Sequence, residues 1–328
     1  REREVHAGPL LVNDLEGKVW SWGTGENGQL GHNEAKSEAV PRQIDSLAAL
    51  RVAQVATGND FSLILTVEGG VYSMGESGQG KLGHGNAVAY KVPTQIAALK
   101  GLQVTQIACG GFHSMASTLD GSLYTWGKNS RGQLGHNSNK ELLVPTVVKS
   151  LQGIHIKTVD SMAGGWEHSL AVTSDCRLFA WGGGYENKPV CGFGPTSDQK
   201  TPKLVQGLSE QQVVFCACGW DHSMAITADG SLYAWGDGSS GKLGHGGQSD
   251  VTKPQRVEGI HVGPSDNTSA KIVWCSGGET HSACVTQNGD IWVWGAGANN
   301  ELGTGSTFSK TVPTRIDAGT PCRAVICG

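Results

Sequence analysis

Short runs of alternating apolar and polar residues follow one another along the chain, separated by clusters of Gly, Asn, Asp and Ser. Residues 113–118 and 122–126 are two such runs, joined through Asp120-Gly121, a dipeptide that favours a tight hairpin turn. In the second run, Tyr124 and Trp126 are two positions apart, so both aromatic rings belong on one face of a strand. No long stretch has helical periodicity. The pattern therefore predicts an all-β protein, with residues 45–50 as a single helical turn.

The same pattern recurs six times. A large apolar residue followed by glycine marks each unit, and successive glycines are 52 to 59 residues apart. The six pairs are Trp22-Gly23, Met74-Gly75, Trp126-Gly127, Trp181-Gly182, Trp235-Gly236 and Trp294-Gly295. A proline follows 18 or 20 residues after each glycine, and in five units a His-Ser or Phe-Ser pair precedes it. Each unit thus predicts four short strands, the last opening on a proline that suits a sheet edge.

A single four-stranded sheet cannot bury two apolar faces by itself, whereas six sheets packed radially can. The sequence therefore predicts one domain over residues 1–328, a six-bladed β-propeller with units at about 10–54, 55–106, 107–161, 162–215, 216–273 and 274–328. The chain starts inside a unit, because residues 10–23 match the second and third strands. Residues 324–328 match a first strand. We expect strands from both ends of the chain to close the propeller.

Composition narrows the possible functions. The formal net charge is −4 and no block of five basic residues occurs, so we expect no direct nucleic-acid partner. No apolar run approaches the roughly 18 residues of a membrane span, and no secretory signal opens the chain, which favours an intracellular protein. The nine cysteines form no CxxC pair, so we expect reduced thiols, no metal site and no cofactor. The histidines before Ser recur in most units, which indicates a structural role and no catalytic triad.

These units resemble the repeats of the regulator of chromosome condensation, the nucleotide-exchange factor of the GTPase Ran. The shared features are the His-Ser strand, the Asp-Gly turn, the Tyr-x-Trp-Gly strand and a Gly-Gln-Leu-Gly loop, seen here at 28–31 and 132–135. Propellers of that family usually have seven blades, which leaves a seven-bladed architecture as an alternative. Its members include exchange factors, recognition domains of ubiquitin ligases, scaffolds and a plant UV-B photoreceptor.

The resemblance implies functional residues in the turn between the first two strands of each unit. Acids and aromatic residues occupy these turns here, namely Asp60, Phe112, Trp166, Glu167, Trp220, Asp221 and Glu279. We expect them on one exposed rim that binds a protein partner through a basic patch, because Trp is enriched at interface hot spots. The alternative is that the acids only cap turn N–H groups. Trp166 and Trp220 are followed by acids, where the photoreceptor has arginine, which disfavours light sensing.

The exchange factor of this family has a wedge that projects after the Trp-Gly of one blade. The corresponding segment here is the irregular loop 183–195, which contains Tyr185 and Glu186. The sequence thus favours a non-enzymatic interaction platform, a propeller module of a larger protein such as a ubiquitin ligase or a scaffold. The alternative is guanine-nucleotide exchange on a small Ran-like GTPase, which leaves catalytic activity as an open question.

Overall fold

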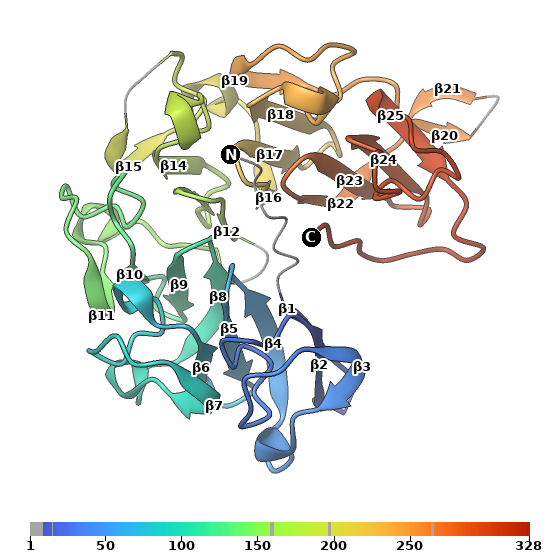
Figure 1. Cartoon of the computed structure of the whole chain (residues 1–328). Helices are drawn as coiled ribbons and strands as arrows, with labels where there is room; N and C mark the ends of the chain where they lie inside the picture. Colours follow the sequence, from blue (N-terminus) through green and yellow to red (C-terminus); the bar gives the residue numbers. More distant parts are fainter. Residues whose placement is uncertain (1–8, 15, 158–160, 196–197, 264–265) are drawn as a thin grey trace.

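The computed structural model describes residues 9–14, 16–157, 161–195, 198–263 and 266–328. Six antiparallel sheets are arranged radially around a common centre (Figure 1). The first strand of each complete blade lies nearest the centre and the fourth lies at the periphery. The only helical segments in the described residues are 3-10 turns, one of them at Asp45–Leu47 as expected. The chain is therefore a six-bladed β-propeller, as its repeats predict.

Blade 1 has three strands in the described residues, and blades 2 and 3 have four each. Blade 1 holds β1 (Pro9–Asn13), β2 (Val19–Gly23) and β3 (Glu38–Gln43). Blade 2 holds β4 (Val52–Thr57), β5 (Phe61–Thr66), β6 (Val71–Gly75) and β7 (Tyr90–Gln95). Blade 3 holds β8 (Val104–Cys109), β9 (His113–Thr118), β10 (Leu123–Gly127) and β11 (Leu142–Val147).

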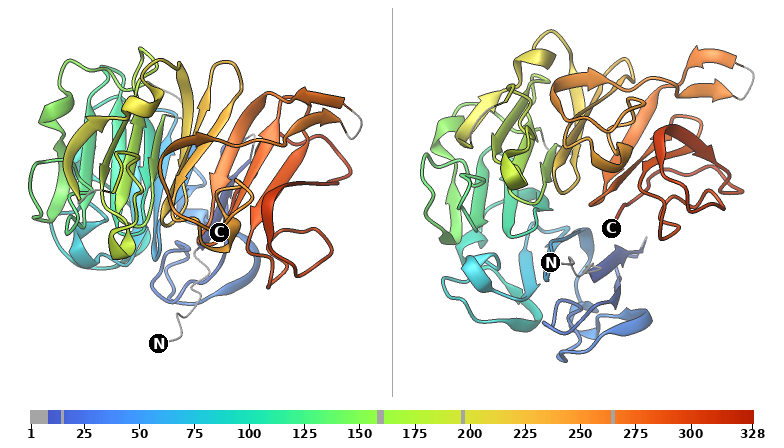
Figure 2. Two further views of the ribbon diagram at one scale, coloured as in Figure 1. Left: turned by 90° about the horizontal axis from the view of Figure 1, so that it is seen from above. Right: turned by 45° about the horizontal axis from the view of Figure 1, so that its top comes forward.

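The other three blades repeat this order. Blade 4 holds β12 (Met162–Gly164), β13 (His168–Val172), β14 (Leu178–Gly182) and β15 (Gln199–Leu204). Blade 5 holds β16 (Val213–Cys218), β17 (His222–Thr227), β18 (Leu232–Gly236) and β19 (Val251–Arg256). Blade 6 holds β22 (Ile272–Gly277), β23 (His281–Thr286), β24 (Ile291–Gly295) and β25 (Lys310–Ile316). The hairpin of β20 (His261–Gly263) and β21 (Asp266–Ser269) projects between blades 5 and 6 (Figure 2).

Tryptophans of the Trp-Gly pairs form the core between blades. Trp126, Trp181, Trp235 and Trp294 are fully buried. Each indole N–H donates a hydrogen bond of 2.7–2.9 Å to a loop carbonyl of the preceding blade, on Lys81, Gln133, Val190 and Lys242 respectively. Because a buried indole N–H needs a partner, these bonds complete the burial of the aromatic rings.

The histidines before Ser join the same blades. His113, His168 and His222 each place Nε2 within 2.8–2.9 Å of a serine Oγ in the next blade. Those serines donate to the loop carbonyls that also accept from the tryptophans. The serine hydroxyl has one proton, so the histidine Nε2 is the donor to Oγ. This arrangement confirms the structural role expected for these histidines.

The C-terminal segment packs on blade 6 in the register of a first strand. Trp274 Nε1 in β22 donates to Val325 O at 2.8 Å. The equivalent bond between blades 2 and 3 runs from Gln54 Nε2 to Ile107 O at 3.0 Å, and Ile107 matches Val325 in the repeat. On the other side of the seam, the described sheet of blade 1 contains three strands, with β1 at its edge. The segment thus contacts blade 6, while in the described residues no strand pairing joins it to β1 to complete blade 1.

Candidate functional site

The turns that follow the first strands of blades 2 to 6 lie side by side in an arc. Backbone N–H groups of Asn59 and Gly111 donate to Gly111 O and Gly165 O, at 3.2 and 3.0 Å. The arc continues from Trp166 N to Trp220 O at 2.9 Å, and from Trp220 N to Gly278 O at 3.2 Å (all four bonds join neighbouring blades). The turns named by the sequence are therefore brought together, as expected.

Three aromatic residues of these turns pack against one another in a row. The ring centroids of Phe112 and Trp166 are 4.7 Å apart at 76°, an edge-to-face contact. Those of Trp166 and Trp220 are 4.1 Å apart at 24°, a stacked contact. Gly111 makes room for this, since a Cβ there would lie 2.8 Å from Trp166 Cε3. Phe112, Trp166 and Trp220, here termed the aromatic ladder, come from blades 3, 4 and 5 and remain half-buried.

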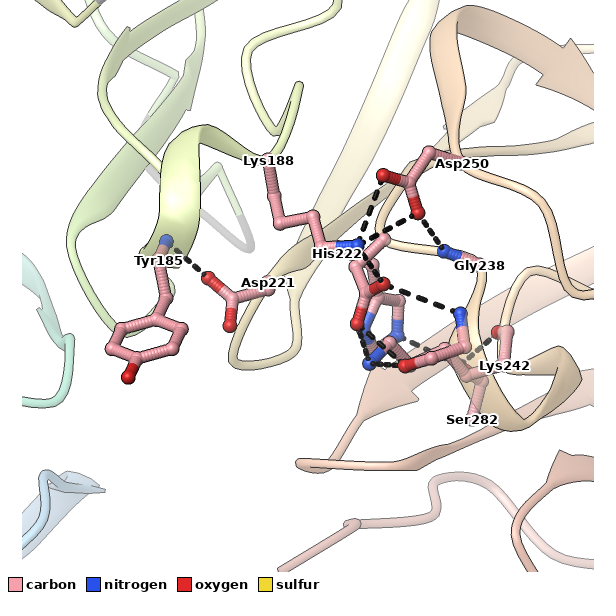
Figure 3. Close-up of polar contacts among 10 residues, drawn as sticks. Tyr185, Lys188, Asp221, His222, Gly238, Lys242, Asp250 and Ser282 are labelled. Carbon is pink, nitrogen blue, oxygen red and sulfur yellow. Dashed lines mark hydrogen bonds and ion pairs between the residues drawn. The ribbon is translucent and has the colours of Figure 1, made fainter.

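Two of the predicted acids are buried, contrary to the exposed positions we expected. Glu167 and Asp221 are each only 7% exposed. Glu167 forms ion pairs with Lys128 Nζ at 2.6 Å and Arg131 Nε at 3.5 Å. Asp221 Oδ1 accepts the backbone N–H of Tyr185 at 2.8 Å (Figure 3). Both carboxylates thus join their turn to a loop of the preceding blade.

The remaining acids of the turns are half-buried and not equivalent. Asp60 accepts from Asn59 Nδ2 at 2.9 Å and occupies the position of Glu167 and Asp221 in its turn. Glu279 directly follows Gly278, so it occupies the position of Trp220, one residue earlier. The four acids therefore do not form one set of matching positions around the rim.

The irregular loop 183–195 lies across the boundary between blades 4 and 5. Its 3-10 turn Tyr185–Asn187 is followed by Lys188, whose Nζ lies 2.9 Å from Asp237 and 3.0 Å from Asp250 of blade 5 (Figure 3). Toward blade 3, Arg131 Nη1 donates to Asn187 Oδ1 at 3.1 Å. The turn is thus attached to both neighbouring blades, and it presents Tyr185, 40% exposed, and Glu186 to solvent.

Cations that the sequence analysis did not identify surround one end of the aromatic ladder. Lys81 Nζ and Lys128 Nζ lie 5.6 and 4.8 Å from the centroid of Phe112. Lys81 is also paired with Glu76, and burial lowers the pKa of its ammonium to about 8. Lys81 lies in the loop after the Met-Gly pair of the preceding unit, and Lys128 directly follows the Trp-Gly pair of the same unit as Phe112. The contact of Lys81 with Phe112 depends on how blades 2 and 3 meet, which the repeat alone does not reveal.

Across the described ranges, no group of three or more His, Cys, Asp or Glu side chains is arranged to hold a metal ion. Nor does any helix in this part of the chain have the length and apolar character of a membrane span.

Comparison with known proteins identifies relatives over nearly the whole chain. Ultraviolet-B receptor UVR8 of Arabidopsis thaliana is 35% identical over 313 residues, which is 95% of this chain and 68% of the receptor. The human E3 ubiquitin-protein ligase HERC2 is also 35% identical over 324 residues, 97% of this chain but 6% of the ligase. The crystal structure of Prp20p from Saccharomyces cerevisiae, described with its binding to Gsp1p and histones, matches with a TM-score of 0.80 at 25% identity, covering 95% of this chain and 76% of Prp20p.

Family models cover almost all of the described propeller. The RCC1-like domain matches residues 9–278, and the regulator of chromosome condensation (RCC1) repeat matches residues 288–328. These matches agree with the repeated His-Ser and Trp-Gly positions that hold the blades together. The chain belongs to the family of RCC1-like propeller domains.

Proposed function

We propose that this domain is a protein-interaction platform whose binding surface is the aromatic ladder together with the turn Tyr185–Asn187. The observation that carries the proposal is the ladder itself, three half-buried aromatic rings from three successive blades. A few residues dominate the binding energy of most protein interfaces, and these residues are enriched in Trp, Tyr and Arg. The likeness to part of HERC2 supports a recognition module in a larger protein of the ubiquitin-ligase or scaffold type.

The ladder is not needed to fill the core between blades. That core already contains Trp126, Trp181 and Trp235, which are fully buried and hydrogen-bonded. The ladder rings keep part of their surface in water, where a partner would bury it. We further propose that the partner is basic, because the chain carries a net charge of −4.

The proposal is tested by capturing partners from a cell extract with the wild-type domain and three variants. Phe112→Ala and Trp220→Ala truncate the ladder, and Leu119→Ala truncates a residue that is 60% exposed on a hairpin turn after β9, outside the ladder. We expect a partner that is retained by wild type and Leu119→Ala and lost from both ladder variants. Direct titration of that purified partner then confirms the contact. Equal retention by all four proteins would refute the proposed surface.

Guanine-nucleotide exchange is the second candidate, and the likeness to Prp20p, a relative that binds the small GTPase Gsp1, favours it. The loop 183–195 would then contact the GTPase and weaken its hold on phosphate and Mg²⁺, with no covalent step. Release of a fluorescent GDP from a panel of small GTPases tests this. Accelerated release that Glu186→Ala abolishes supports exchange. No acceleration with any GTPase leaves the interaction platform as the function.

A further inference from the structure

The two ends of the aromatic ladder differ in their electrostatic surroundings. At the Phe112 end, Lys81 and Lys128 already lie over the aromatic ring, 5.6 and 4.8 Å from its centroid. Among the described residues, no cation lies over the indole of Trp166 or of Trp220. One side of the Trp220 ring is covered by Trp166. The Trp220 end is thus the part of the ladder where a cation from another molecule can add a new contact.

The loops beside the two ends of the ladder also differ in charge, and those beside the Trp220 end are the more acidic. In blades 2 to 6, the turn after the first strand is hydrogen-bonded to the loop that follows the third strand, as Asp237 N to Asp221 O at 2.8 Å, so both segments lie at one end of the blade. In blades 2 and 3 these segments, 58–61, 76–89, 110–113 and 128–141, contain three acids and four basic residues. In blades 5 and 6 the corresponding segments, 219–222, 237–250, 278–281 and 296–309, contain five acids and one basic residue.

This difference in the number of acidic and basic residues makes the Trp220 end the negative end of the surface. The single basic residue there, Lys242, is buried and paired with Asp237, so it does not project a cation toward a partner. Lys188 of the neighbouring loop is likewise paired with Asp237 and Asp250. A negative potential beside an aromatic face attracts a cation both through space and through the quadrupole of the indole.

We propose that the Trp220 end of the ladder binds an arginine side chain of the protein partner, with its guanidinium stacked on the indole. This inference rests on the proposed interaction surface and names the chemistry that it recognises. A guanidinium is planar and weakly hydrated, so it stacks on an indole at a lower desolvation cost than an ammonium group does. The partner is thereby oriented, with its arginine over blades 5 and 6 and another part of its surface over Phe112 and blade 3.

The test uses two labelled peptides that differ only in charge, Gly-Ser-Arg-Gly-Arg-Ser-Gly and the same peptide with citrulline in place of both arginines. Fluorescence anisotropy at low salt measures the Kd of each peptide for the folded domain. We expect the arginine peptide to bind at least about fivefold more tightly, in line with a cation–π contact at a partly exposed site. We expect Trp220→Ala to remove this preference and Trp220→Phe, which keeps an aromatic face, to retain part of it.

Charge and position need matched controls. Glu301→Gln removes one acid near the Trp220 end, and Glu68→Gln removes one exposed acid in a turn between the second and third strands of blade 2. We expect Glu301→Gln to weaken the arginine peptide about twofold and Glu68→Gln to leave it unchanged. Circular dichroism on each variant, and the use of Trp220→Phe beside Trp220→Ala, separates a lost contact from a lost fold.

The outcomes distinguish this inference from the proposed function. Equal affinity for the arginine and citrulline peptides, no saturable binding of either, or binding that is unaffected by Trp220→Ala overturns the arginine site. If the captured partner still requires Phe112 and Trp220 in that case, the interaction surface stands and only its cation preference is wrong. If partner capture is insensitive to both ladder variants, the proposed function itself fails.

Discussion

His168 Nε2 lies 2.9 Å from Ser223 Oγ, although the two residues belong to different blades and are 55 positions apart. Ser223 in turn donates to Val190 O at 2.7 Å, and Trp235 Nε1 donates to the same carbonyl at 2.8 Å. One loop carbonyl thus fixes the second and third strands of the next blade. The His-Ser motif, which looks catalytic in the sequence, thus forms hydrogen bonds between neighbouring blades. Its histidine has to stay neutral, because a charged ring would not remain buried at this position.

This requirement predicts that the domain loses stability in mild acid. Burial lowers the pKa of His113, His168 and His222 from 6.5 to about 3. The unfolded chain therefore binds more protons than the folded chain between pH 6.5 and 3, so the free energy of unfolding falls as pH falls through that window. Three such groups give a slope of up to about 4 kcal/mol per pH unit well below pH 6.5. Urea unfolding at pH 7, 5.5 and 4.5 measures it.

Blade 2 supplies the control for this slope, because Phe61 occupies the position that histidine has in blades 3 to 6. Phe61 is fully buried, so a phenyl ring fits that position. We expect His222→Phe to lower the slope by about one third, whatever its effect on stability at pH 7. An unchanged slope would show that these histidines do not account for the acid sensitivity.

Trp126 and Trp22 occupy equivalent positions and should differ in their contribution to stability. Trp126 is fully buried and bonded to Lys81 O, whereas Trp22 at the edge blade is half-buried. Trp126→Ala should cost about 3–5 kcal/mol in the free energy of unfolding, the usual effect of emptying a large aromatic site. Trp22→Ala should cost about 1 kcal/mol, the centre of the range for an ordinary substitution. Equal losses in denaturant titrations would contradict the partial exposure of Trp22.

Glu167→Lys should destabilise the fold, although the sequence places Glu167 in a turn where such a change is expected to be mild. The new lysine would face Lys128 and Arg131, which now pair with Glu167. Breaking a buried ion pair by removing one partner typically costs about 3 kcal/mol or more. Glu186→Lys is the control, since Glu186 is exposed and should change stability by less than about 0.5 kcal/mol. Thermal melts of both variants decide whether Glu167 is structural.

Deleting residues 323–328 should weaken blade 6. The deletion removes the acceptor of Trp274 Nε1 at Val325 and the bond from Cys327 N to Ser276 Oγ, at 2.8 and 3.0 Å. With the accompanying loss of packing, we expect about 3 kcal/mol, taking each hydrogen bond at about 1 kcal/mol. Ile326→Ala should have little effect, because Ile326 is 74% exposed. A truncated domain that melts like the full chain would mean that the segment does not hold β22 in place.

Most of the fold could be predicted because each repeat carries its own evidence. The Asp-Gly turns, the paired aromatic residues and the prolines indicate four strands in one unit, and the spacing indicates six units. The contacts between units were not predictable in this way. The partners of Glu167 are Lys128 and Arg131, nearly forty residues earlier in the preceding unit, and only the packing of blades 3 and 4 brings them together. For the same reason, its burial could not be read from the polar character of its turn.

The aromatic ladder was partly predictable. The sequence places Phe112, Trp166 and Trp220 in corresponding turns, but it does not show that they stack, because stacking depends on the angle between blades. Gly111 was one available signal, since a residue without a side chain in the turn next to that of Trp166 leaves space for its indole. For Glu279 the sequence indicated an equivalence that the structure does not show. It resembles the other acids in type, yet it stands one position earlier and therefore in the place of Trp220.

The bonds that serine hydroxyls of the His-Ser and Phe-Ser pairs and N–H groups of the Trp-Gly tryptophans make between blades all run in one direction, with the donor in one blade and the accepting carbonyl in the blade before it. They extend from Ser62 and Gln29 O, between blades 2 and 1, to Trp294 and Lys242 O, between blades 6 and 5. In the described residues, no hydrogen bond joins blade 6 to blade 1. Through these bonds the described blades form a linear array from blade 1 to blade 6, although the propeller is circular in outline. Amide protons should exchange fastest in blades 1 and 6 and slowest in blades 3 and 4, so that unfolding advances from the seam inward.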